Sequence, residues 1–88
     1  MKNKNMEPRN AALGANEFVA AGRLLWGEHW QRSMQEALQI NQIARIRAWA
    51  SGVSRIPTGV WHELEKLLGD RGNTINELRR KIANSDDI

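Results

Sequence analysis

The sequence predicts an all-α protein, a compact bundle of about five short helices. Large apolar residues return every three or four positions through most of the chain, as they do on the buried face of a helix. No segment alternates apolar and polar residues for long enough to form a strand. The chain has 88 residues, enough for one small domain and its core. We expect residues 16–84 to form this domain, between a flexible arm at residues 1–15 and a flexible tail at residues 85–88.

Two helices are predicted in the first half of the chain. The first begins at Asn16, whose side chain can accept a hydrogen bond from the first turn, and ends at Gly27. The second extends from about Glu28 to Leu38. The residues expected to face inward are Phe18, Ala21, Leu24 and Leu25 in the first helix and Trp30, Met34, Ala37 and Leu38 in the second.

The third predicted helix extends from about Gln42 to Ser51 and ends at Gly52. The polar break before it, residues 39–41, is so short that the second and third helices should be neighbours. Its inward residues are expected to be Ile43, Ile46 and Ala50, with Trp49 at the edge of that face.

Two further helices are predicted in the last third of the chain. Pro57 suits the first turn of the fourth, because its φ angle is already helical and its missing N–H is not needed there. That helix is expected to end at Gly69 or Gly72, and the fifth to begin with Thr74 and Glu77 spaced as a capping box. The inward residues are expected to be Val60, Trp61, Leu64, Leu67 and Leu68 in the fourth helix and Ile75, Leu78 and Ile82 in the fifth, with Arg79, Arg80 and Lys81 outward.

Charge is unevenly distributed along the chain, although the net charge is only +3. Residues 1–60 hold eight basic and four acidic residues, whereas residues 61–88 hold five and six. No carboxylate lies between Glu36 and Glu63, and the Lys and Arg residues of this gap are Arg45, Arg47 and Arg55. An acid-free segment of this length is suited to phosphate groups, and a solvated face formed by chance is the alternative.

Several classes of function are disfavoured. The absence of cysteine excludes disulfides and thiolate metal sites, and we expect a cytoplasmic protein. No apolar run approaches the roughly 18 residues that span a membrane, and no signal-peptide core is present. The segment HELEK, His62–Lys66, begins like a zinc-binding HExxH helix, but Lys66 stands where the second ligand would be. Lacking a phosphate loop or clustered catalytic groups, the protein is expected to be no enzyme and to use no cofactor or small-molecule substrate.

The order of the central elements is that of a helix-turn-helix unit: a short helix, a tight turn, a second short helix with exposed arginines, and a proline-started helix. The stretch HWQRSMQEALQINQIARIRAWASGVSRIPTGVW, residues 29–61, resembles the small helix-turn-helix regulators of bacteria and their phages, of lambda-repressor-like type. The likeness is carried by Trp49-Ala50-Ser51-Gly52 and by Ile56-Pro57-Thr58-Gly59-Val60-Trp61, and it spans roughly residues 23–72.

The chain departs from the pattern of this family at two places. Gln35 and Gln39 stand where the family usually has a small residue and then a glycine. The interval from Ile40 to Trp49 is one residue longer than the common pattern, so Ile46 is expected to be buried in place of Arg45.

The resemblance implies that the third helix lies in the major groove of DNA. If its isoleucines face the core, its opposite face carries side chains that can contact base edges, since Arg recognises guanine, Gln adenine and Ala the thymine methyl group. Ser and Thr hydroxyls and the amides near Pro57 suit the phosphates. The predicted DNA-binding residues are Gln42, Ala44, Arg45, Arg47 and Ala48 for the bases, and Ser51, Ser54, Arg55 and Thr58 for the phosphates.

We therefore expect sequence-specific binding of double-stranded DNA by a homodimer that acts as a transcriptional regulator, a repressor. The alternative is a small helical protein-interaction module, such as an antitoxin-like or phage accessory protein, which requires partly exposed tryptophans. A core role for Trp30, Trp49 and Trp61 is preferred to base stacking. RNA binding is disfavoured because no aromatic-rich sheet or GxxG loop is present.

Overall fold

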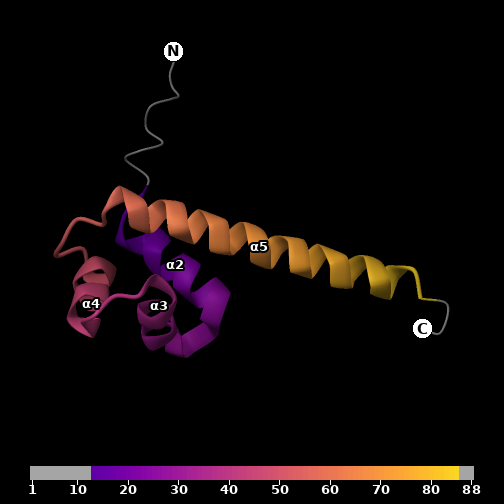
Figure 1. The fold of residues 1–88 in the computed structure, drawn as a ribbon, viewed down its shortest axis with the longest axis horizontal. Coiled ribbons are helices and arrows are strands. Elements are labelled where there is room, and N and C mark those ends of the chain that lie inside the picture. The colour runs from indigo at the N-terminus through magenta and orange to yellow at the C-terminus, as the bar shows by residue number, and fades with distance from the viewer. Residues whose placement is uncertain (1–12, 86–88) are drawn as a thin grey trace, which may run out of the picture.

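The computed structural model describes residues 13–85, which form four α-helices and one short 3-10 helix. In chain order these are α2 (Ala15–Trp26), η1 (Gly27–His29), α3 (Trp30–Leu38), α4 (Ile43–Ser51) and α5 (Thr58–Ala83) (Figure 1). No strand is present in this part of the chain, so the prediction of an all-α fold is confirmed. The predicted arm at residues 1–15 and tail at residues 85–88 lie almost entirely outside the described residues.

Helix α2 has Gly14 as its N-terminal cap, and not Asn16 as predicted. The Glu17 carboxylate accepts a hydrogen bond from the Gly14 N–H at 2.8 Å, which satisfies one of the free donors of the first turn. Asn16 is exposed within that turn. Leu24, predicted to face inward, is 73% exposed, and Gly22 is buried. The sequence pattern therefore identified the helix but included one leucine that lies outside its buried arc.

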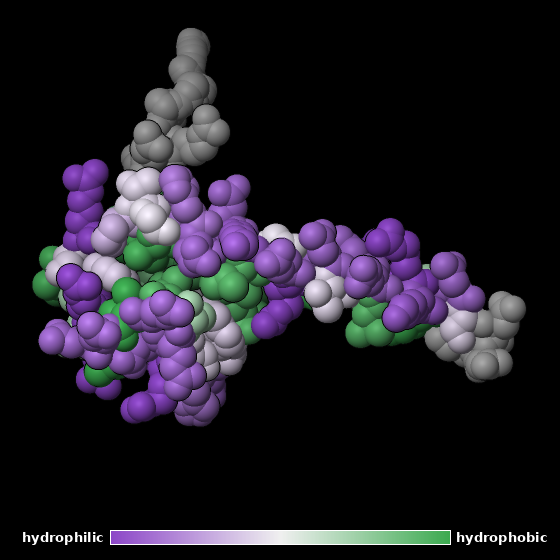
Figure 2. All heavy atoms as spheres, viewed as in Figure 1, coloured by the Kyte–Doolittle hydropathy of each residue, from purple (hydrophilic) through white to green (hydrophobic). Residues whose placement is uncertain are grey.

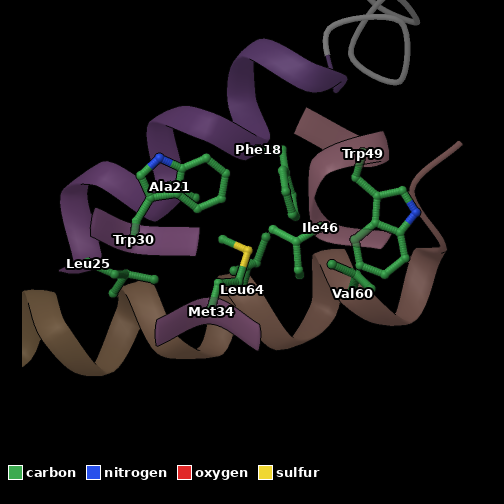
Figure 3. Packing of buried hydrophobic residues seen from close by; sticks show 9 residues of the cluster. All are labelled: Phe18, Ala21, Leu25, Trp30, Met34, Ile46, Trp49, Val60 and Leu64. Atoms are coloured by element: carbon green, nitrogen blue, oxygen red, sulfur yellow. The ribbon is translucent and has the colours of Figure 1, made fainter. Parts of the chain in front are cut away.

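Phe18 lies at the centre of the hydrophobic core. Its ring makes edge-to-face contacts with one tryptophan from each of α3, α4 and α5, at centroid separations of 5.7 Å to Trp30, 5.8 Å to Trp49 and 6.4 Å to Trp61. This is the arrangement that aromatic quadrupoles favour, and each pair stabilises by about 0.5–1.5 kcal/mol beyond its buried area. The predicted core role of these tryptophans is confirmed. The buried cluster comprises Phe18, Ala21, Leu25, Trp30, Met34, Ile46, Trp49, Val60 and Leu64 (Figure 3).

Helix α5 is one continuous helix of 26 residues, so the prediction of separate fourth and fifth helices is wrong. Gly69 and Gly72, the predicted ends, lie inside it, because glycine weakens a helix by about 1 kcal/mol without forcing it to stop. The Thr74 hydroxyl, predicted to cap a new helix, instead donates to the carbonyl oxygen of Asp70 at 3.1 Å within the same helix. No helix of residues 13–85 is long and apolar enough to cross a membrane.

The continuity of α5 changes the surroundings of its C-terminal half. Its first turns pack against the other helices through Val60 and Leu64, whereas the rest of the helix extends away from them (Figure 1). Ile75, Leu78 and Ile82, predicted to face inward, are 55%, 57% and 53% exposed. Only α2 to α4 and the first half of α5 therefore form a compact unit, which we call the body.

Candidate nucleic-acid interface

The connection between α3 and α4 is a tight turn held by backbone and side-chain hydrogen bonds. Gln39 takes up the left-handed conformation with a φ of 56°, and the following Ile40 N–H donates to the Gln35 carbonyl oxygen at 3.0 Å. The Gln35 side-chain amide donates to the carbonyl oxygen of Asn41 at 3.4 Å. The two glutamines that depart from the family pattern thus both serve the turn, and Gln39 occupies a conformation that glycine adopts more easily.

Helix α4 is fixed to the body by two large side chains. Ile46 is fully buried and Trp49 is 5% exposed, so the prediction that Ile46 and not Arg45 faces the core is confirmed. Ile43 and Ala50 are half-buried on the same side. Gly52 ends the helix in the left-handed conformation, at a φ of 83° that glycine adopts without strain. With its inner face and its end fixed, α4 presents a defined outer face to solvent.

The outer face of α4 is narrow and lined by small side chains. Ala44 and Ser51 are exposed and Ala48 is half-buried, all on the side opposite Ile46. The Ala48 carbonyl oxygen accepts hydrogen bonds from the Val53 N–H at 2.9 Å and from the Ser51 hydroxyl at 3.2 Å. Ser51 thus uses its hydroxyl proton to close the helix end, which leaves its oxygen as an acceptor and makes it a weaker phosphate ligand than predicted.

Arg45 and Arg47 lie on the two flanks of this outer face. Positions two residues apart point about 160° from each other around a helix axis, so the small residues lie between the two guanidinium groups. Both side chains are exposed. Across residues 13–85 neither of them forms an ion pair or a side-chain hydrogen bond, and the same holds for Arg55. Their charges are therefore available to a ligand.

The segment between α4 and α5 continues the exposed surface. Ser54, Arg55 and Thr58 are exposed there, and Pro57 precedes the first turn of α5 with an extended backbone. The first-turn N–H groups of α5 carry the positive end of its dipole. Hydrophilic side chains cover much of the end of the body where α4 lies (Figure 2).

Most of the predicted site residues are exposed. Those exposed are Gln42, Ala44, Arg45, Arg47, Ser51, Ser54, Arg55 and Thr58, and Ala48 is half-buried. Gln42 precedes α4 with no side-chain capping bond, so its amide is also available. The sequence prediction did not include Val53, which is 80% exposed beside this surface. The sequence feature that could have indicated its exposure is its place directly after Gly52, which ends the helix.

The chemistry of this surface is that of anion recognition. Its charged groups are three arginines, and no carboxylate lies in the sequence from Gln42 to Thr58. In the part of the chain that the structure describes, no three His, Asp or Glu side chains come together as a metal site. The two histidines lie apart, on η1 and α5. The charged groups that this surface offers to a ligand are therefore the guanidinium groups of its arginines.

Comparison of the chain with protein-family models, with curated proteins and with solved structures finds no match in any of the three.

Proposed function

We propose that the protein binds double-stranded DNA in a sequence-specific manner, with α3 and α4 acting as a helix-turn-helix and α4 entering the major groove. The observation that carries the proposal is the outer face of α4: small side chains at its centre and a free guanidinium group on each flank. Ile46 and Trp49 hold this face rigid on the body, so little conformational entropy is lost when it docks.

The dimensions of the groove suit this face. The major groove is about 12 Å wide and admits one α-helix. Ala44 and Ala48 let the helix axis approach the groove floor, where their methyl groups can contact thymine. Because Arg45 and Arg47 diverge around the helix, they cannot both contact the same base pair. One can contact guanine O6 and N7 in bidentate fashion, which discriminates by about 1–3 kcal/mol, while the other reaches the groove wall.

The loop before α5 supplies contacts that position the helix without reading sequence. Arg55 and the hydroxyls of Ser54 and Thr58 are exposed beside α4, at a suitable place for the phosphates that border the groove. The amides at the start of α5 add a favourable dipole. Gln42, which directly precedes α4, is proposed to form a bidentate hydrogen bond with adenine. In this proposal the protein is a transcriptional repressor, because occupation of a promoter by such a body blocks other proteins.

The alternative function, a protein-interaction module, depends on partly exposed tryptophans. None of the four tryptophans is exposed: Trp30 and Trp49 are buried, and Trp26 and Trp61 are half-buried against the core. The two buried tryptophans cannot anchor a partner, so this alternative rests on the partly exposed faces of Trp26 and Trp61.

The test is binding to a site selected from random duplex DNA. We expect the wild-type protein to enrich one sequence, and the Arg45→Ala/Arg47→Ala variant to lose its preference for it while keeping its far-UV helical signal. The matched control is Arg23→Ala/Arg80→Ala, which removes the same charge from exposed positions on other surfaces. An equal loss of sequence preference in both variants would mean that net charge, and not the position of the arginines, causes it. No enrichment of any sequence by the wild type would refute the proposal.

A further inference from the structure

The projecting half of α5 carries an apolar stripe that is not part of the buried cluster of the body. Ile75, Leu78 and Ile82 are each more than half exposed, although each belongs to a residue type that is usually buried. They lie along one edge of the projecting helix, where Figure 2 shows apolar side chains. The stripe continues that of the body, because Leu64 is buried and Leu68 half-buried on the same helix.

The spacing of this stripe is that of a coiled-coil seam. From Leu64 the positions are Leu64, Leu68, Arg71, Ile75, Leu78 and Ile82. The intervals alternate between four and three, which keeps the residues facing a second helix along their whole length. An ordinary surface helix also has apolar residues three and four positions apart, but its apolar face is usually wider than this stripe of one residue per half-heptad. The pattern matches best a helix with the same repeat.

The projecting helix also needs a covering partner for its own stability. Helices shorter than about 12–15 residues are marginal in water even with favourable composition. The segment after Leu68 contains Gly69, Gly72, Asn73 and Thr74, all residues of low helix propensity. Burial of an apolar face is the usual source of stability for such a helix.

We infer that residues 71–82 of α5 pair in antiparallel orientation with the same residues of a second copy of this chain. The part that such a dimer plays in recognising a two-fold DNA site rests on the proposed function, whereas the pairing itself rests on the stripe. A two-fold axis between Asn76 and Glu77 sets Ile75 against Leu78 of the partner subunit, and both chains supply the same contacts.

The charges select the antiparallel orientation. In a parallel dimer Arg71 would face its own copy in the seam, with like charges opposed. In the antiparallel register Arg71 faces Ile82 of the partner subunit, which its aliphatic stem can cover. Its guanidinium group then lies near the C-terminal end of the other α5, where free carbonyl groups favour a cation.

The residues bordering the seam also avoid opposed charges in this register. Arg79 faces Gly72 of the partner subunit, and Lys81 faces Thr74 of the partner subunit. Because long cationic side chains meet small or neutral residues on both borders, neither pair repels.

The first experiment measures the mass of the full chain by sedimentation equilibrium from 1 to 100 µM. We expect a dimer for the wild type and a monomer for Ile75→Glu/Leu78→Glu, whose substitutions lie outside the buried cluster and leave the body folded. The control, Leu24→Glu, introduces the same kind of charged side chain at an exposed leucine of α2 and should remain a dimer. A wild-type monomer at all concentrations, or equal dissociation of the control, would overturn the inference.

Orientation is tested by disulfide trapping, because the chain has no native cysteine. Thr74→Cys and Lys81→Cys proteins are prepared separately, mixed and oxidised. We expect a crosslinked heterodimer at several times the yield of either variant alone, whereas a parallel pair would hold these two positions about 10 Å apart along the axis and give none. Binding of the selected DNA by a monomeric wild type would leave the proposed function standing and remove only this inference.

Discussion

Gly22 of α2 lies directly against the indole ring of Trp30, so closely that a Cβ atom at position 22 would overlap Cε3 and Cδ2 of the ring. Gly22 is buried and Trp30 is 4% exposed. The contact brings the start of α3 onto α2, and α3 in turn carries the turn that orients α4. A glycine in the middle of a helix therefore determines where the proposed DNA-binding helix sits.

Replacing Gly22 by alanine should destabilise the protein by about 1–3 kcal/mol. Alanine favours the helix by about 1 kcal/mol, but the new methyl group must displace a packed indole, and overpacking of a core outweighs that gain. Gly59→Ala is the control, since nothing lies within 4 Å of its Cβ position. Urea unfolding followed by tryptophan fluorescence measures both. A Gly22→Ala protein as stable as the control would show that the Trp30 indole can move away from position 22 at no cost in the free energy of unfolding.

Replacing Gln39 by glycine should stabilise the protein by about 0.5–1 kcal/mol. The left-handed conformation of Gln39 costs a residue with a Cβ about 1–2 kcal/mol, which exceeds the extra flexibility that glycine brings to the unfolded chain. Gln39→Ala, which keeps the Cβ, should show no such gain. Thermal unfolding distinguishes the two. An equal melting temperature for both variants would show that the backbone of Gln39 is not strained.

Replacing Ile46 by alanine should cost about 2–5 kcal/mol, because its side chain is fully buried between α4 and the core. Truncation to alanine at Val53, which is 80% exposed, should change the free energy of unfolding by less than about 0.5 kcal/mol. Urea unfolding of the pair checks the orientation of α4 independently of DNA. Similar losses at both positions would contradict the burial of Ile46 in the core.

Replacing Arg55 by alanine should weaken binding to all DNA sequences alike and reduce the slope of log affinity against log salt by about one phosphate contact. Arg55 is proposed to contact a phosphate and no base, so the preferred sequence should not change. Fluorescence anisotropy at several salt concentrations gives the slope. A change of preferred sequence with an unchanged slope would place Arg55 at a base instead.

Helices α2, α3 and α4 could be predicted from sequence because each has its apolar residues at helical spacing, although α3, predicted from about Glu28, begins at Trp30 after the 3-10 turn η1. Gly27 and Gly52 both cap helices with positive φ angles, as expected. The burial of Ile46 could be predicted from the interval between Ile40 and Trp49 and from the helical spacing that puts Ile46 on the same face as Ile43 and Ala50. Local pattern and tertiary packing agree in these elements.

The end of the chain could not be predicted in the same way. Gly69 and Gly72 weaken a helix without stopping it, so the same residues are compatible with two helices or one. Apolar spacing at Ile75 and Leu78 shows that a face is to be covered but does not say whether the cover comes from the same chain. Nor does the spacing show that the hydroxyl of Ser51 bonds to its own helix, since that choice depends on how α4 ends.

The claim that the outer face of α4 meets DNA is tested most directly by backbone amide chemical shifts of the labelled protein titrated with its selected duplex. The account predicts that the largest changes fall between Gln42 and Thr58, with those of Arg45, Arg47 and Arg55 among them, and that α2 changes little. Changes concentrated on α2 or on the projecting half of α5, with α4 unaffected, would contradict it.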